Sequence, residues 1–293
     1  MKRCLGSFLI IAALSAAVFV GAVPARGSLF SSVERKTHPF EPAEELFYEA
    51  EFSRSLLRKL DVADFKFRAT RTFLNTDSQQ PATERPYSLT LTADISSKGF
   101  FTRLFNLNFR ERVESTVDPL SFTVQRTKIH DEQGKRVRLT ETIFDFETGK
   151  MSWTLRDPNN PSGQPRNVVA EFSGQIQDVL SAIYFIRTRS LEVGQSFQVS
   201  IADGGRIYQV PVKVVEKKRM KTVLGRVNVL RVDPELFGPN NIIAREEGEF
   251  SLWVTDDHRH IPVGGRIKTE YGTFDVKLKR VDFNPPAEVP SNR

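Results

Sequence analysis

The fold is decided by the stretch Phe65-Lys66-Phe67-Arg68-Ala69-Thr70-Arg71-Thr72-Phe73. Its aromatic and small residues alternate with polar ones, and a period of two is the pattern of a β-strand with one buried face. Tyr87–Ile95 repeats the alternation, with Leu89, Leu91 and Ala93 on the apolar side. Both stretches therefore predict half-buried strands.

Turn signals join further alternating segments into hairpins. Asp131-Glu132-Gln133-Gly134 separates Phe122–His130 from Arg136–Phe146, Glu147-Thr148-Gly149 precedes Met151–Leu155, and Asp203-Gly204-Gly205 separates Phe197–Ile201 from Ile207–Val215. Three more predicted strands follow, at Glu249–Thr255, Ile261–Thr269 and Thr273–Val281. Asp and Gly at such positions favour tight turns between antiparallel strands. The sequence therefore predicts a mostly β protein built as an antiparallel meander.

One segment departs from the period of two. Apolar residues fall at helical spacing at Val179, Leu180, Ile183 and Ile186. Asp178 stands near the start of this segment and Arg187 and Arg189 near its end, where their charges suit the helix dipole. A shorter second helix is expected over Phe100–Phe105. We expect a strongly curved sheet, a half-barrel or open barrel, with one or two short helices packed across it to bury the Phe faces.

The N-terminus has the pattern of a secretory signal peptide over residues 1–25. Met1-Lys2-Arg3 is basic, the run from Phe8 to Val20 is apolar apart from one serine, and small residues follow as far as Ala25. An uncleaved anchor is the alternative. Cleavage removes Cys4, the single cysteine, and with it any disulfide. We predict export to the periplasm, soluble or peripherally associated with the envelope, with no transmembrane span after cleavage.

The remaining chain divides into three parts. Residues 26–43 are predicted to be a flexible lead-in, residues 44–283 a single antiparallel β domain and residues 284–293 a disordered tail. The chain has 42 Lys and Arg against 36 Asp and Glu, and loss of Lys2 and Arg3 leaves 40 − 36 = +4. This mild excess suits a solubilising surface or an anionic envelope partner, and we expect no nucleic-acid partner.

Several motifs carry a family resemblance. They are Asp178–Arg187 with Leu191-Glu192-Val193-Gly194, Asp203-Gly204-Gly205 with Tyr208, Thr222–Gly225 before Arg231-Val232, and Leu252–Asp257 through Arg259 and Pro262, preceded by Tyr48-Glu49 and Val113–Asp118. Over about residues 44–283 the chain resembles an exported bacterial family of unknown function, catalogued as domain of unknown function 3108. The resemblance implies an exported, mostly β protein akin in shape to the half-barrels of periplasmic lipoprotein carriers. It gives His258 and His260 no role.

Phenylalanine is the main compositional hint to a ligand. The chain has 23 Phe residues but only 5 Tyr and 2 Trp. A curved sheet lined with Phe65 and Phe67 would enclose an apolar pocket able to hold an acyl chain. An ordinary packed core is the alternative.

The predicted helix offers a second candidate site. Tyr184 and Arg187 lie three residues apart, so they share a helix face and would present a ring and a guanidinium to an anionic ligand. Alternatively, Arg187 pairs with Asp256 or Asp257 across the sheet while Tyr184 packs. Trp253 leaves the same choice between ligand and core.

The segment from Asp256 to His260 is the densest cluster of potential metal ligands. Strand alternation would place His258 and His260 on one face, yet two ligands are too few for a zinc site. The alternative is a polar turn in which Asp side chains bond to the backbone. We therefore expect no metal and no other cofactor, and keep Asp257 as a ligand-binding candidate.

No nucleophile elbow, Ser-x-x-Lys pair or phosphate-binding loop occurs in the sequence. The leading hypothesis is a non-enzymatic exported cell-envelope protein that binds an apolar or amphiphilic, lipid-like ligand on a Phe-rich curved sheet. The alternative is an envelope assembly or scaffold protein that binds another protein through strand edges. A third is an envelope glycan or lipid hydrolase, supported only by acidic residues near Asp257.

Overall fold

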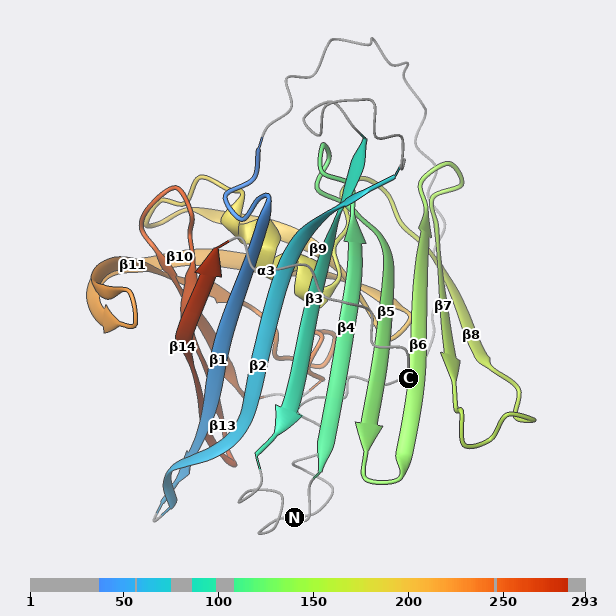
Figure 1. Cartoon of the computed structure of the whole chain (residues 1–293), viewed down its shortest axis with the longest axis horizontal. Coiled ribbons are helices and arrows are strands. Elements are labelled where there is room, and N and C mark those ends of the chain that lie inside the picture. Colours follow the sequence, from blue (N-terminus) through green and yellow to red (C-terminus); the bar gives the residue numbers. More distant parts are fainter. Residues whose placement is uncertain (1–36, 56, 75–85, 99–107, 245–246, 284–293) are drawn as a thin grey trace.

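The computed structural model describes residues 37–283, apart from 56, 75–85, 99–107 and 245–246. The described residues form one sheet of fourteen antiparallel strands and the helix α3 (Val179–Arg187) (Figure 1). The predicted signal peptide, most of the lead-in, the second helix at Phe100–Phe105 and the tail lie outside the described residues.

The strands have the following bounds in chain order. They are β1 (Ala43–Arg54), β2 (Leu57–Phe73), β3 (Tyr87–Ser97), β4 (Phe109–Val117), β5 (Val124–Gln133), β6 (Arg136–Asp145), β7 (Lys150–Arg156), β8 (Arg166–Glu171), β9 (Ser196–Asp203), β10 (Arg206–Thr222), β11 (Gly225–Pro234), β12 (Glu249–Thr255), β13 (Pro262–Thr269) and β14 (Gly272–Phe283). Every strand predicted from alternation is present, and β10 runs seven residues beyond its predicted end at Val215.

The strand order is β8-β7-β6-β5-β4-β3-β2-β1-β14-β13-β12-β11-β10-β9. Neighbours in sequence pair as a meander requires, except that β8 and β9 form the two edges and β1 pairs with β14 in the middle. Tyr48 of β1 lies opposite Leu278 of β14. The predicted single meander is therefore two meanders joined by the terminal strands, because α3 and its flanking loops carry the chain from one edge to the other. The predicted class, a curved open antiparallel sheet with a short helix, is confirmed.

The sheet curls around α3, so that β9, β10 and β11 lie behind β1 to β4 with the helix between them (Figure 1). One apolar cluster joins these layers. It contains Leu89 and Leu91 of β3, Val210 and Val212 of β10, and Tyr184 of α3, all buried. The main core therefore fills the space on one side of the helix.

The start of α3 is held by a reciprocal cap. Asp178 Oδ1 accepts a hydrogen bond from the Ser181 backbone N–H at 2.7 Å, and Ser181 Oγ accepts one from the Asp178 N–H at 2.9 Å. Such a box satisfies two of the backbone donors that a helix start leaves free. The predicted helix is present, and Asp178 is its N-cap residue.

Residues 37–43 pack against the sheet. Phe40 is buried, and the Glu41 carboxylate accepts hydrogen bonds from Tyr87 Oη at 2.8 Å and Arg71 Nε at 2.5 Å. This part of the predicted lead-in is therefore ordered by burial and polar contacts. Within the ranges that the structure describes, no helix has the length and hydropathy that crossing a membrane requires.

Candidate ligand-binding site

A pocket of about 270 Å³ lies between α3 and the concave face of the first meander. Its sheet wall comes from β2 to β7, and the end of β9 closes one side. Phe67, Ile95, Val113, Trp153 and Leu155 give this wall its apolar surface. The pocket is the part of the space between the two arms of the curved sheet that the main core does not fill.

The helix presents two different faces. Val179 and Ile183, one turn apart, line the pocket, and Val179 is 44% exposed while Ile183 is half-buried. Ala182, Tyr184 and Ile186 point into the main core and are buried. The described residues thus leave apolar surface uncovered on the pocket side of α3, although burial of such surface stabilises a fold.

An acidic row crosses the apolar wall. Ile95, Glu111, Asp131 and Arg138 lie in register on β3, β4, β5 and β6, and all four line the pocket. Residues opposite one another on antiparallel strands have Cβ atoms about 4.5–5.5 Å apart. Asp131 also accepts a hydrogen bond from Arg136 at 3.2 Å. Glu111 therefore sits beside another carboxyl group and among apolar side chains.

Asp203 brings a further carboxyl group to this end of the pocket. Its Oδ2 atom is buried and has no hydrogen-bond partner in the described structure. Burial, together with the nearby Asp178, raises the pKa of Asp203 to about 7. Burial, together with Asp131 and Asp203, raises the pKa of Glu111 to about 8. Near neutral pH a large share of both groups is therefore in the uncharged form.

Asp178, by contrast, is fully used in holding the fold together. Its Oδ2 accepts hydrogen bonds from Ser115 Oγ of β4, at 2.5 Å, and from Thr127 Oγ1 of β5. Its other oxygen caps α3 through Ser181. This carboxylate fixes the helix start to β4 and β5 of the sheet.

Comparisons with known proteins address the family. A family profile described as a protein of unknown function, DUF3108, matches residues 57–279. The chain belongs to this family. The resemblance drawn from the sequence motifs is confirmed. Among solved structures, a beta-barrel-like protein of the DUF1849 family from Brucella abortus is similar at 9% identity and a TM-score of 0.46, covering 83% of this chain and 98% of that one. No curated protein matches.

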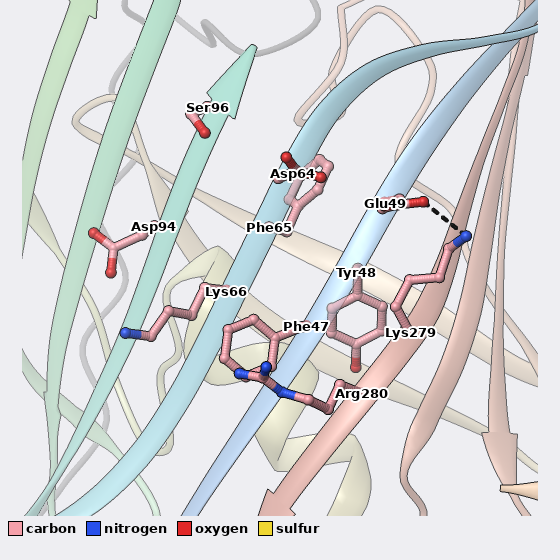
Figure 2. Close-up of a pocket in the computed structure, with 10 residues that line it drawn as sticks. All are labelled: Phe47, Tyr48, Glu49, Asp64, Phe65, Lys66, Asp94, Ser96, Lys279 and Arg280. Carbon is pink, nitrogen blue, oxygen red and sulfur yellow. Dashed lines mark ion pairs between the residues drawn. The ribbon is translucent and has the colours of Figure 1, made fainter. Parts of the chain in front are cut away.

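The DUF3108 chain places its two candidate phenylalanines side by side. Phe65 and Phe67 have ring centroids 6.3 Å apart, and Phe67 lines the pocket under α3. Phe65 lines a different hollow of about 350 Å³, formed by β1, β2, β3 and β14 (Figure 2). Only one of the two predicted residues therefore belongs to the pocket.

The second hollow is a different kind of surface. Figure 2 shows the guanidinium of Arg280 lying across the ring of Phe47, with its central carbon 3.7 Å from the ring centroid. Lys279 pairs with Glu49 at 2.7 Å in the same view. Because these side chains satisfy one another, the hollow offers a ligand fewer open groups than the pocket under α3.

Tyr184 and Arg187 do come together, but inside the protein. The Arg187 guanidinium carbon lies 5.3 Å from the Tyr184 ring centroid, and both residues are 1% exposed. Glu44 of β1 accepts two hydrogen bonds from Arg187, at 2.6 and 2.9 Å. The predicted pairing of Arg187 with Asp256 or Asp257 is wrong, because the central position of β1 brings Glu44 under the helix end.

Trp253 lies away from the pocket in this DUF3108 chain. It is half-buried beside a smaller apolar cluster, with Lys218 Nζ 5.0 Å and the Arg266 guanidinium carbon 5.9 Å from its ring. Neighbouring Asp256 pairs with Lys217. Trp253 is therefore held by packing and by cations of its own sheet.

The segment from Asp256 to His260 forms a polar turn, which was the predicted alternative to a metal site. Asp257 Oδ1 accepts hydrogen bonds from the backbone N–H of Arg259 at 3.0 Å and of His260 at 3.2 Å. His258 lies in this turn and is exposed. Because the segment is not a strand, alternation does not place the two histidines on one face. Among the described residues, no three His, Cys, Asp or Glu are placed to hold a metal ion.

The residues that sequence reasoning missed are the carboxyl groups of the pocket. Glu111 shares its strand face with Val113 and Val117, and Asp131 shares its face with Ile129. An acidic residue on the apolar side of an alternating strand was the available signal. It identifies a buried charge, but only the register and the β9 end show that Glu111, Asp131 and Asp203 meet.

Proposed function

We propose that the protein is a non-enzymatic, exported cell-envelope protein that binds an apolar or amphiphilic ligand in the pocket under α3. The observation that carries this proposal is the apolar surface of Val179 and Ile183, which faces an apolar sheet wall and which the described part of the chain does not cover. Ligand sites are typically concave, mostly apolar and furnished with a few polar groups. Export to the periplasm rests on the N-terminal sequence pattern and is part of the proposal.

The size of the pocket limits the ligand. Its volume of about 270 Å³ lies just below the roughly 300–1,000 Å³ of pockets for drug-sized molecules. It therefore suits one alkyl or acyl chain segment rather than a whole two-chain lipid. The head group and any second chain would remain at the pocket mouth.

Native mass spectrometry of the protein purified from a bacterial periplasm tests this proposal. We expect a stoichiometric adduct that solvent extraction releases and lipid analysis identifies as an amphiphile. A bare mass, together with no calorimetric binding of twelve-carbon amphiphiles, would overturn it. N-terminal sequencing of the same sample tests cleavage after residue 22 or 25 and so separates export from ligand binding.

An assembly or scaffold role is the second candidate, and the edge strand β8 favours it. Among the described residues, β8 pairs only with β7, and Val169 of β8 is 64% exposed. Ile143 of β6 lies in the same cross-strand row and is 48% exposed. Free strand edges beside apolar side chains are where partner strands add. Cross-linking in the periplasm that captures one defined protein through β8 would support this role.

The carboxyl groups of Asp256 and Asp257 give no support to a hydrolase, since an ion pair and a turn engage them.

A further inference from the structure

The polar end of the pocket has an unequal charge. Among the residues that the structure describes, four carboxyl groups line the pocket, against one guanidinium, that of Arg138. Two of the four are engaged with the protein, since Asp178 holds α3 to the sheet and Asp131 bonds to Arg136. Glu111 and Asp203 are therefore the acidic groups that face a ligand.

Asp203 has an acceptor to which no described residue donates a hydrogen bond. Its Oδ2 atom is shielded from solvent without a donor, whereas nearly all buried polar atoms in native proteins have a partner. Its place is fixed by the β9 end and by the tight turn at Gly204 and Gly205, whose φ angles are +56° and +82°. A donor on a ligand would complete this site.

The charge on that donor follows from the neighbours. Opposite charge within about 4–6 Å favours ionised carboxylates, and like charge disfavours them. An ammonium group between Glu111 and Asp203 would let both release their protons to solvent and then pair with it. An anionic head group would meet carboxyl groups on three strands and one guanidinium, and a hydroxyl would fill the Asp203 acceptor without using the charge.

We propose that this pocket selects amphiphiles with a primary ammonium head group, which Glu111 and Asp203 bind while the alkyl chain lies against Val113, Leu155 and Ile183. This inference rests on the proposed function of the pocket. The ammonium can belong to a simple alkyl amine or to a zwitterionic aminophospholipid, and the two sources share the chemistry that the site recognises.

Isothermal titration calorimetry at pH 7 with three amphiphiles of equal chain length tests the inference. We expect dodecylamine to bind at least tenfold more tightly than dodecanol, and dodecanoate to bind most weakly. Equal or tighter binding of dodecanol or dodecanoate would overturn the ammonium preference. If none of the three binds, the proposed function itself fails. If dodecylamine binds, the affinity for dihexanoyl phosphatidylethanolamine is compared with that for dihexanoyl phosphatidylglycerol. This comparison distinguishes an aminophospholipid from a simple amine as the ligand.

Isosteric variants locate the preference. Glu111→Gln and Asp203→Asn should each weaken dodecylamine binding at least tenfold while leaving dodecanol binding within threefold. Glu114→Gln, on the opposite face of the same strand β4, is the matched control and should change neither. Because dodecanol binding reports an intact pocket, misfolding is recognised. An unchanged ratio of amine to alcohol affinity in both variants, or an equal loss for both ligands in a folded variant, contradicts the inference.

Discussion

The two ends of α3 bury charge in opposite ways. At its C-terminal end, Arg187 and Glu44 form a two-bond ion pair whose side chains are wholly buried. At its N-terminal end, Glu111 and Asp203 face a pocket, and one Asp203 oxygen has no hydrogen-bond partner among the described residues. A charge that the protein itself neutralises belongs to the architecture, whereas the carboxyl group without a donor in an apolar pocket supports the proposed ligand site.

The largest effect on stability is expected at the C-terminal end of α3, where Arg187 pairs with Glu44. Arg187→Leu leaves Glu44 buried without its partner, which typically reduces stability by about 3–5 kcal/mol. Urea unfolding followed by circular dichroism measures the loss. Adding Glu44→Leu should recover much of it, since replacing both charges of a buried pair is far less costly. Arg226→Ala, at an exposed position, is the control and should stay within about 0.5 kcal/mol. A loss below about 1 kcal/mol for Arg187→Leu would contradict the architectural role.

Filling the pocket at the N-terminal end of α3 with a larger side chain should affect ligand binding far more than folding. Thr140 of β6 lines the pocket, whereas Ile143 of the same strand is exposed on the other face. Thr140→Phe should weaken binding of dodecylamine at least tenfold, with a change in unfolding free energy below about 1.5 kcal/mol. Ile143→Phe is the matched control and should leave affinity unchanged. Equal affinities of the two variants in calorimetry would remove the pocket from the account.

The pocket carboxyl groups should also give stability a distinct pH dependence. The pKa of Glu111 is about 8 in the folded protein, against a usual 4.5. Between these values the unfolded chain loses a proton that the folded protein keeps, so stability falls as pH rises from about 4.5 to 8. Glu111→Gln removes this contribution, and its stability should fall less over that window. Thermal unfolding of both proteins from pH 4 to 9 measures the difference; parallel curves would show that Glu111 is not perturbed.

The smallest effect is expected at Asp257, which lies near the C-terminal end of α3 but outside both the ion pair and the pocket. Asp257→Ala removes an acceptor from two backbone N–H groups and should lower stability by about 1 kcal/mol. Asp257→Asn keeps an acceptor and should lower it by less than half as much. Neither variant should alter dodecylamine affinity. A selective loss of binding in Asp257→Asn would return this residue to the ligand site.

Local patterns predicted most elements, but not the contacts between distant ones. Alternation located strands such as β2 and β3, and the helical spacing with Asp178 located α3, because these signals act within a few residues. The pairing of β1 with β14 joins segments more than two hundred residues apart in sequence, and no local period encodes it. The wrong partner assigned to Arg187 has a similar cause, since its partner Glu44 lies 143 residues away in sequence. The acidic pocket wall likewise depends on the register between β4, β5 and β6.

The most direct test of the account compares what three versions of the protein carry out of the periplasm. Native mass spectrometry should show a stoichiometric adduct on the unmodified protein and on Ile143→Phe, and its loss from Thr140→Phe. Solvent extraction of the first two should release the same amine-bearing amphiphile. An adduct that persists on folded Thr140→Phe, or bare masses for all three proteins together with no calorimetric binding of twelve-carbon amphiphiles, would contradict the claim that the pocket under α3 is a ligand site.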